Sequence, residues 1–162
     1  MVLHIRPAKP EDAESIARLA AAGAREERRN GRLTADAFRR DGFGPRPAFG
    51  ALIAEQNGVP IGYAIHYPAY DTDSAVRGIF LADLFVTEPM RRRGVGRALV
   101  AGLAAHVRAD GGRFMFWAVL KRNRGGRRFY TKLAPELGDA ILCAALGRDF
   151  DRLAEMGGAK PR

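Results

Sequence analysis

The twenty residues LADLFVTEPMRRRGVGRALV, numbered 81 to 100, decide the fold of this 162-residue chain. An apolar run ends at Val86, a proline turn follows, and a basic loop with two glycines opens into a segment with an apolar residue at every fourth position. This change from strand-like to helical periodicity predicts a buried strand, a tight loop and an amphipathic helix in succession. The sequence Asp110-Gly111-Gly112 is typical of the end of such a helix.

The loop in the middle of this segment has the composition of an anion-binding site. Backbone N–H groups at a helix start converge on one point, the helix dipole adds positive charge there, and glycines allow a phosphate to approach closely. The dinucleotide-binding fingerprint needs three glycines and the nucleoside-triphosphate loop needs Gly-Lys-Ser/Thr, and this loop has neither. The Gly-x-Gly pattern alone is equally consistent with a tight turn flanked by solvated arginines, which are Arg91, Arg92, Arg93 and Arg97.

The rest of the chain alternates between strand-like and helical patterns. The order is β-α-α-β-β-β-α-β-α-β-α, which predicts one α/β domain over residues 1–162 with a mixed sheet. The expected strands are residues 2–7, 49–56, 60–67, 79–86, 113–120 and 140–146. The expected helices start at Lys9-Pro10-Glu11-Asp12, at Ala35 after the cap Thr34, at Gly94, at Asn123 and at Phe150. Residues 24–32 are expected to be a frayed helix end or a surface loop.

The charge balance favours a polyanionic partner. The net charge is +9, from 27 Lys and Arg against 18 Asp and Glu, and either a nucleic acid or a ligand with several phosphates would be attracted by it. The arginines concentrate beside one loop, and no helix-turn-helix, RNA-recognition or zinc-finger pattern is present, which argues against a nucleic acid.

Other classes of protein are excluded by what the sequence lacks. No apolar run has the length of a membrane span and residues 1–12 lack the features of a signal peptide, so we expect a cytoplasmic protein that does not bind a membrane. The single Cys143 has no partner for a disulfide, and the histidines have no metal-ligand spacing, so we expect no metal site.

Two motifs resemble those of the GNAT superfamily of N-acetyltransferases. Arg91-x-x-Gly94-x-Gly96 after the strand LFV resembles its pyrophosphate-binding motif, and WAVLKRNRGGRRFY places Asn123 and Tyr130 after the next strand, as in that family. The stretches DGFGPRPAFGALIAEQNGVPIGYAIHYPAYD, LADLFV and FYTKL resemble the diamine and polyamine (thialysine) acetyltransferase branch, from about Leu3 to Leu146.

The resemblance implies a fold, a co-substrate and a partner. It implies a mostly antiparallel central sheet flanked by helices whose fourth and fifth strands splay apart, with acetyl-coenzyme A (acetyl-CoA) as co-substrate in the gap. It also implies a small-molecule amine as acceptor, direct attack in a ternary complex and a homodimer.

The resemblance also assigns roles to individual residues. Tyr130 is expected to be the general acid that protonates the departing sulfur. Asn123 is expected to contact the pantetheine arm, although it could equally be an N-cap, and Arg128 is expected to reach the phosphates. The remaining cofactor-binding candidates are the strand residues Leu84, Phe85 and Val86, which would pair with the pantetheine, and the loop residues Arg91, Arg92, Arg93, Gly94, Val95, Gly96 and Arg97.

The acceptor side is less defined by the sequence. An alkylamine has a pKa of about 10.4 and arrives protonated, so it needs a carboxylate or a water to take its proton. Relatives with LEDLFV have a glutamate where this chain has Ala82, which removes one candidate base. The other acidic candidates for the acceptor end are Asp83, Glu26, Glu27 and Asp71. The positive net charge favours an acidic or neutral acceptor over a polycation, and a protein acetyltransferase or a non-catalytic nucleic-acid-binding module remain as alternatives.

Overall fold

The computed structural model describes residues 2–138 and 142–157. Its chain divides into two compact units, Met1–Ala118 and Val119–Arg162. The single domain expected over residues 1–162 stays a prediction.

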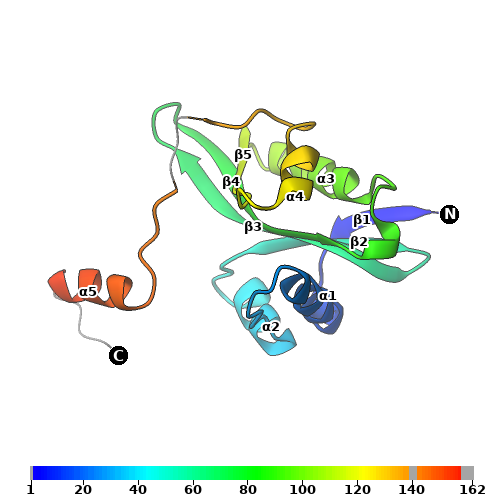
Figure 1. The fold of residues 1–162 in the computed structure, drawn as a ribbon, viewed down its shortest axis with the longest axis horizontal. Coiled ribbons are helices and arrows are strands. Elements are labelled where there is room, and N and C mark those ends of the chain that lie inside the picture. Colours follow the sequence, from blue (N-terminus) through cyan, green and yellow to red (C-terminus); the bar gives the residue numbers. More distant parts are fainter. Residues whose placement is uncertain (1, 139–141, 158–162) are drawn as a thin grey trace. The chain divides into compact units, whose positions relative to one another are not determined.

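The first unit is built on one five-stranded sheet in the order β1-β2-β3-β4-β5 (Figure 1). The first three neighbouring pairs are antiparallel and only β4 and β5 are parallel, which confirms the mixed, mostly antiparallel sheet. The strands are β1 (Leu3–Pro7), β2 (Gly50–Gln56), β3 (Val59–Asp71), β4 (Val76–Val86) and β5 (Phe114–Trp117).

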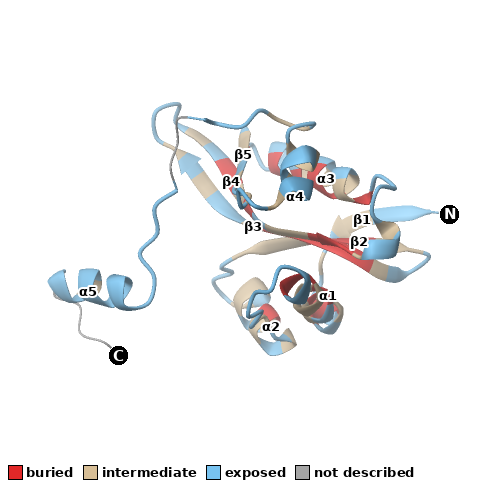
Figure 2. Ribbon diagram, viewed as in Figure 1, coloured by how far each residue is buried: buried red, intermediate tan, exposed pale blue. Residues whose placement is uncertain are grey.

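Helices cover both faces of this sheet (Figure 1). The short 3-10 helix η1 (Pro10–Asp12), α1 (Ala13–Glu26) and α2 (Ala35–Phe43) lie on one side, and α3 (Val95–Ala109), which follows the 3-10 turn η2 (Glu88–Met90), lies on the other. Buried residues are concentrated in the central strands of the sheet and in α1 and α3 (Figure 2). Leu99 and Leu103 of α3 are fully buried, as the four-residue spacing predicts, so truncating either to alanine would cost about 2–5 kcal/mol.

The backbone geometry shows a tight turn at Asn57-Gly58 and confirms the predicted cap at Thr34. Asn57 and Gly58 both have positive φ, 51° and 78°, as a tight turn between antiparallel strands requires. The Thr34 hydroxyl accepts a hydrogen bond of 3.1 Å from the N–H of Ala37 and so caps α2.

The parallel pairing of β4 with β5 is short. It runs from Gly78 opposite Phe114 to Leu81 opposite Trp117, whereas β4 continues through Ala82 to Val86. Within the described residues, β4 therefore continues beyond the end of β5 at Trp117, and the expected splaying of the two strands stays a prediction. The strand predicted over residues 113–120 is shorter than expected because it ends where this pairing ends.

The second unit contains α4 (Arg124–Tyr130) and α5 (Arg148–Met156), at the two positions where helices are predicted. The strand predicted over residues 140–146 is wrong for residues 142–146, which form no regular element, and residues 140–141 lie outside the described residues. Leu142 and Leu146 are 76% and 75% exposed, so this apolar run is not buried against a strand. An apolar run predicts a strand only where a neighbouring strand offers it a partner.

Candidate functional site

The site begins at the C-terminal end of β4, beyond Leu81, the last residue that pairs with β5. Thr87 donates its N–H to the carbonyl oxygen of Ile61, and the register then places Phe85 opposite Tyr63 and Val86 opposite Gly62. Because hydrogen-bonded and non-bonded pairs alternate in an antiparallel ladder, Phe85 uses its backbone groups toward β3. The backbone groups of Leu84 and Val86 consequently point to the open edge of β4.

The turn before α3 has the geometry of an anion cradle. Arg92 and Gly94 have positive φ values of 61° and 85°, and Gly94 is the N-cap residue of α3. No side chain caps this helix, and among the described residues no acceptor is recorded for the N–H groups of Val95, Gly96 and Arg97. The first turn of α3 thus presents its N–H groups and the positive end of its dipole to the outside.

Arg91 has a different environment from the other arginines of the turn. Its Nε donates to the carbonyl oxygen of Val86 at 2.8 Å, its Nη2 pairs with Glu26 at 2.5 Å, and its Cζ lies 5.5 Å from the centre of the Phe85 ring. It therefore joins α1, the end of β4 and the turn, whereas Arg92, Arg93 and Arg97 are exposed and have no ion pair within the described part of the chain.

Three of the predicted site residues lie in the second unit. Asn123 is the N-cap of α4, and its Oδ1 accepts a hydrogen bond of 2.8 Å from the N–H of Gly126. The Tyr130 ring packs edge-to-face against Phe129, with ring centres 4.9 Å apart. Arg128 helps to line a cavity of about 320 Å³, together with Arg124, Arg127, Thr131 and Glu136.

The acidic candidates are not equivalent. Glu26 is paired with Arg91 and Glu27 with Arg29, at 2.5 and 2.6 Å. Asp71 stands opposite Val76 at the turn end of the β3–β4 ladder, and hydrogen bonds from Ser74 and from the N–H of Asp73 hold its pKa below the usual value. It is six residues along β3 from Ile65, the partner of Asp83, or roughly 20 Å. The structure thus separates Asp71 from the other three.

Asp83 has a partner that sequence reasoning missed. The hydroxyl of Tyr63 donates to its Oδ2 at 2.6 Å, and Tyr63 is only 1% exposed. Burial first, and the charge of Asp83 next, raise the pKa of Tyr63 far above its usual value, so the hydroxyl stays protonated and acts as a donor. Arg29 and Glu27 also act on this hydroxyl through their charges. The signal was available, since a carboxylate inside the apolar strand LADLFV needs a buried donor.

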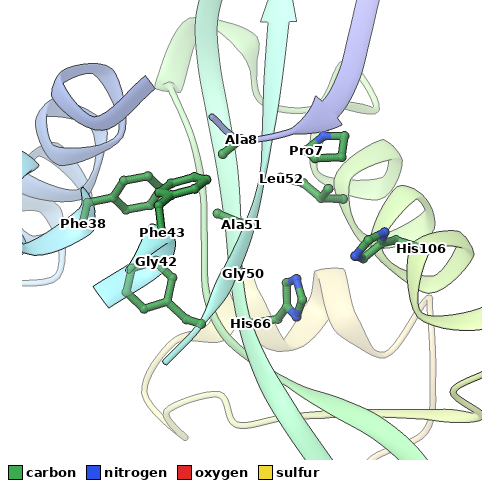
Figure 3. A pocket seen from close by; sticks show the side chains of 11 residues that line it. Pro7, Ala8, Phe38, Gly42, Phe43, Gly50, Ala51, Leu52, His66 and His106 are labelled. Carbon is green, nitrogen blue, oxygen red and sulfur yellow. The ribbon is translucent and has the colours of Figure 1, made fainter. Parts of the chain in front are cut away.

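A separate cavity of about 160 Å³ lies between α2, β2 and the histidines of β3 and α3 (Figure 3). The rings of His66 and His106 are 6.0 Å apart, and Nδ1 of His66 is buried with no hydrogen-bond partner among the described residues. Burial, and then the charge of His106, lower the pKa of His66, so that it is neutral near pH 7. None of the predicted site residues lines this cavity.

The described residues also bear on metals and membranes. Within ranges 2–138 and 142–157, no group of three or more His, Cys, Asp or Glu side chains is placed to hold a metal ion. None of the helices described in those ranges combines the length and the hydropathy needed to cross a bilayer.

Comparison with known proteins gives one family. The model of the acetyltransferase (GNAT) family matches residues 14–134. The thialysine N-epsilon-acetyltransferase of Bos taurus is 30% identical over 142 residues, which cover 82% of this chain and 83% of the relative. The Sus scrofa protein of that name is 32% identical over 140 residues, covering 80% and 81%. The Homo sapiens spermidine/spermine N(1)-acetyltransferase-like protein 1 is 30% identical over 106 residues, covering 61% and 15%.

Solved structures support the same fold. An integron cassette protein from the mobile metagenome of V. cholerae aligns with a TM-score of 0.80 at 16% identity, covering 96% of this chain and 99% of that protein. The ribosomal-protein-alanine N-acetyltransferase of Brucella melitensis biovar Abortus aligns with a TM-score of 0.74 at 21% identity, covering 90% and 100%.

The family match extends from α1 through α4 and so includes both the open edge of β4 and the turn before α3. The two thialysine enzymes align along at least 80% of the chain. This chain therefore belongs to the GNAT superfamily, in the branch of the thialysine and polyamine acetyltransferases, and it is an N-acetyltransferase that acts on amines.

Proposed function

We propose that this enzyme transfers the acetyl group of acetyl-CoA to a primary amine of a small molecule by direct attack within a ternary complex. The observation that carries the proposal is the row of uncapped N–H groups at the start of α3, which follows directly on the open edge of β4. The acceptor class is a diamine, a polyamine or a lysine-like amino acid, since the relatives are named for thialysine and for spermidine and spermine.

The residues of the turn fit a diphosphate group. Its negative charges need several convergent N–H donors and a positive surrounding, and both are provided by the first turn of α3 and by the exposed arginines beside it. A Cβ atom at Gly94 would meet nothing within 4 Å, so the space in front of the turn is open. We assign the diphosphate to Arg92, Arg93, Gly94, Val95, Gly96 and Arg97, with Arg91 fixing the turn to β4.

The open edge of β4 fits an amide-containing arm. Leu84 and Val86 have backbone donors and acceptors on that side, and a pantetheine has two amides that could bond them as an added strand does. Val86 already accepts from Arg91, but a carbonyl oxygen has two lone pairs and can accept a second hydrogen bond. The backbone groups of Phe85 point to β3 and not to the open edge, and its ring packs in the hydrophobic core.

Acetyl-CoA, when bound, supplies a thioester carbonyl as the group that the amine attacks. The chain must then position the amine, polarise the carbonyl and protonate the sulfur that leaves. Tyr130 is proposed as the proton donor because its phenol is the acidic group that the family motif places in that role. Asn123 and Arg128 are proposed as further contacts of the pantetheine and of a phosphate.

Two measurements test this function. Isothermal titration calorimetry with CoA measures binding to the turn, and thiol release from acetyl-CoA measures turnover with thialysine, spermidine, ornithine and a lysine-containing peptide. Binding together with release for a small amine is the expected result. Binding with release only for the peptide would make it a protein acetyltransferase, and absence of CoA binding would remove the proposal.

Two further properties are proposed from the resemblance, a homodimer and a cytoplasmic location. Sedimentation equilibrium of the full chain tests the first, because a dimer has twice the mass of the 17.7 kDa chain. Fractionation of the source cells tests the second.

A further inference from the structure

We infer that Asp83 is the carboxylate that receives the ammonium group of the acceptor, and that Tyr63 is a positioning residue that holds Asp83 for this task. The inference rests on the proposed function and deepens it by naming the acceptor subsite. It also identifies a residue, Tyr63, to which the sequence alone assigned no role.

The carboxylates near the end of α1 differ in whether a cation already pairs with them. Glu26 and Glu27 are each neutralised by an arginine, Arg91 and Arg29. Asp83 forms no ion pair among the described residues, and its recorded partner is the neutral hydroxyl of Tyr63. A half-buried carboxylate without a cation is the one that gains most from an incoming ammonium.

Asp83 lies on β4 just beyond the part of the strand that pairs with β5. It lies two residues beyond Leu81, the last residue of β4 that pairs with β5. It also precedes Leu84 and Val86, whose backbone groups face the open edge. A pantetheine that runs from the turn before α3 back along β4 would bring its thioester to this part of the strand, so Asp83 stands at the reacting end.

Tyr63 positions Asp83 through its hydroxyl group. Its hydroxyl donates to Oδ2 at 2.6 Å from the neighbouring strand, and its ring is packed in the core against Phe85, with ring centres 6.3 Å apart. This donor fixes the rotamer of Asp83 and leaves Oδ1, which has no recorded partner among the described residues, for the ammonium. A fixed acceptor costs less entropy on binding than a mobile one.

The charges around Asp83 also bear on the rest of the acceptor molecule. Because both glutamates are already paired with arginines, Asp83 is the unpaired carboxylate that this region offers to an ammonium. A lysine-like amino acid has one reacting ammonium and a distal zwitterionic group without net charge, so it suits this charge pattern better than a polyamine with several ammonium groups does.

A double-mutant cycle with Tyr63→Phe and Asp83→Asn tests the inference, with thialysine and spermidine as acceptors. We expect Asp83→Asn to lower kcat/KM for thialysine about 100-fold or more and Tyr63→Phe about 10-fold, chiefly through KM. We expect Tyr63→Phe to have no further effect in the Asp83→Asn background, because its action passes through Asp83. Thialysine should have the higher kcat/KM of the two amines. The control Tyr67→Phe removes a hydroxyl from an exposed tyrosine of the same strand and should change nothing.

Several outcomes would overturn the inference. If Tyr63→Phe lowers kcat/KM equally in the wild-type and Asp83→Asn backgrounds, Tyr63 has a merely structural role. Unchanged kinetics for Asp83→Asn would exclude Asp83 as the ammonium site. If either result is found while the wild-type enzyme still binds CoA and acetylates an amine, the proposed function stands. If the wild-type enzyme neither binds CoA nor acetylates an amine, the proposed function and the inference are both overturned.

A second measurement does not depend on the folding of Tyr63→Phe. The chain has four tyrosines, and incorporation of 3-fluorotyrosine gives four ¹⁹F resonances. Phenylalanine variants of the other three assign the Tyr63 resonance by elimination. Addition of thialysine should shift that resonance in the wild-type chain, and a resonance that does not move would overturn the inference.

Discussion

Nε of Arg91 donates a hydrogen bond of 2.8 Å to the carbonyl oxygen of Val86, the last residue of β4. The same guanidinium pairs with Glu26 at the end of α1. Arg91, an arginine of the proposed diphosphate-binding turn, therefore holds the strand end, the turn and a helix together. The proposal thus gives the arginines of this turn two separate roles, since Arg91 fixes the turn and its exposed neighbours attract phosphate.

Arg91→Ala should lower stability as well as CoA affinity, whereas Arg93→Ala should lower affinity alone. Loss of a hydrogen bond to a charged donor and of a half-exposed ion pair is expected to cost about 1–2 kcal/mol in the free energy of unfolding. Urea denaturation and calorimetry with CoA measure the two effects. Equal stability of the two variants would contradict the tethering role of Arg91.

Gly94→Ala should weaken CoA binding more than an equivalent change elsewhere. Gly94 and Gly111, at the two ends of α3, have φ values of 85° and 80°, and a Cβ at either would meet nothing within 4 Å. Both alanine variants should therefore lose about 1 kcal/mol of stability from backbone strain. Only the change at Gly94 adds a methyl group in the cradle, and Gly94→Asp should abolish binding because it adds a negative charge as well. Equal CoA affinities for Gly94→Asp and Gly111→Asp would exclude the cradle.

The sequence predicts the parts of this molecule that depend on local chemistry. The helical spacing of Leu99 and Leu103, the cap at Thr34 and the turn at Asn57 are each specified within a few residues. The strand expected at 140–146 fails at 142–146 because an apolar run does not specify a partner strand. Tyr63 and Asp83 lie 20 residues apart and meet only through the β3–β4 register, so no local pattern connects them. The use of Arg91 as a tether likewise depends on where α1 ends.

The stability of the fold should decrease at acid pH through Asp12. Its carboxylate accepts bonds of 2.7 and 2.9 Å from Arg6 and 2.7 Å from the N–H of Lys9, and the Arg6 bonds hold its pKa below the usual value. Because the pKa is lowered in the folded state, this stabilisation is complete above the unfolded value of about 3.9 and is lost as the pH falls through the folded value.

Asp12→Asn should therefore cost about 2 kcal/mol at pH 7 and much less at pH 3, as measured by urea denaturation. Asp36→Asn is the control, since that side chain is 98% exposed and should have little effect at either pH. A constant cost of Asp12→Asn across this range would contradict the prediction.

Two variants of Asn123 can separate its role as the cap of α4 from its proposed contact with the pantetheine. Asn123→Asp keeps an oxygen that can accept from the N–H of Gly126, so α4 should remain capped, but it loses the amide N–H₂ donor and gains a charge. We expect stability to be retained and the KM for acetyl-CoA to rise several-fold, whereas Asn123→Ala should lose about 1 kcal/mol of stability as well. A KM that changes only in the alanine variant would reduce Asn123 to a cap.

Tyr130→Phe should lower kcat by about 100-fold or more and leave the Kd of CoA nearly unchanged. The variant keeps the ring that packs against Phe129 and removes only the hydroxyl, so the loss reports on proton transfer to the departing sulfur. A matched control is Phe129→Leu, which alters the packing of the same helix without touching a hydroxyl, and should affect stability more than kcat. The leaving group provides a further check, because an acetyl thioester with a more acidic thiol needs less help from an acid. If Tyr130 donates the proton, the variant should lose less activity with such a thioester, and an equal loss with both thioesters would exclude it as the acid.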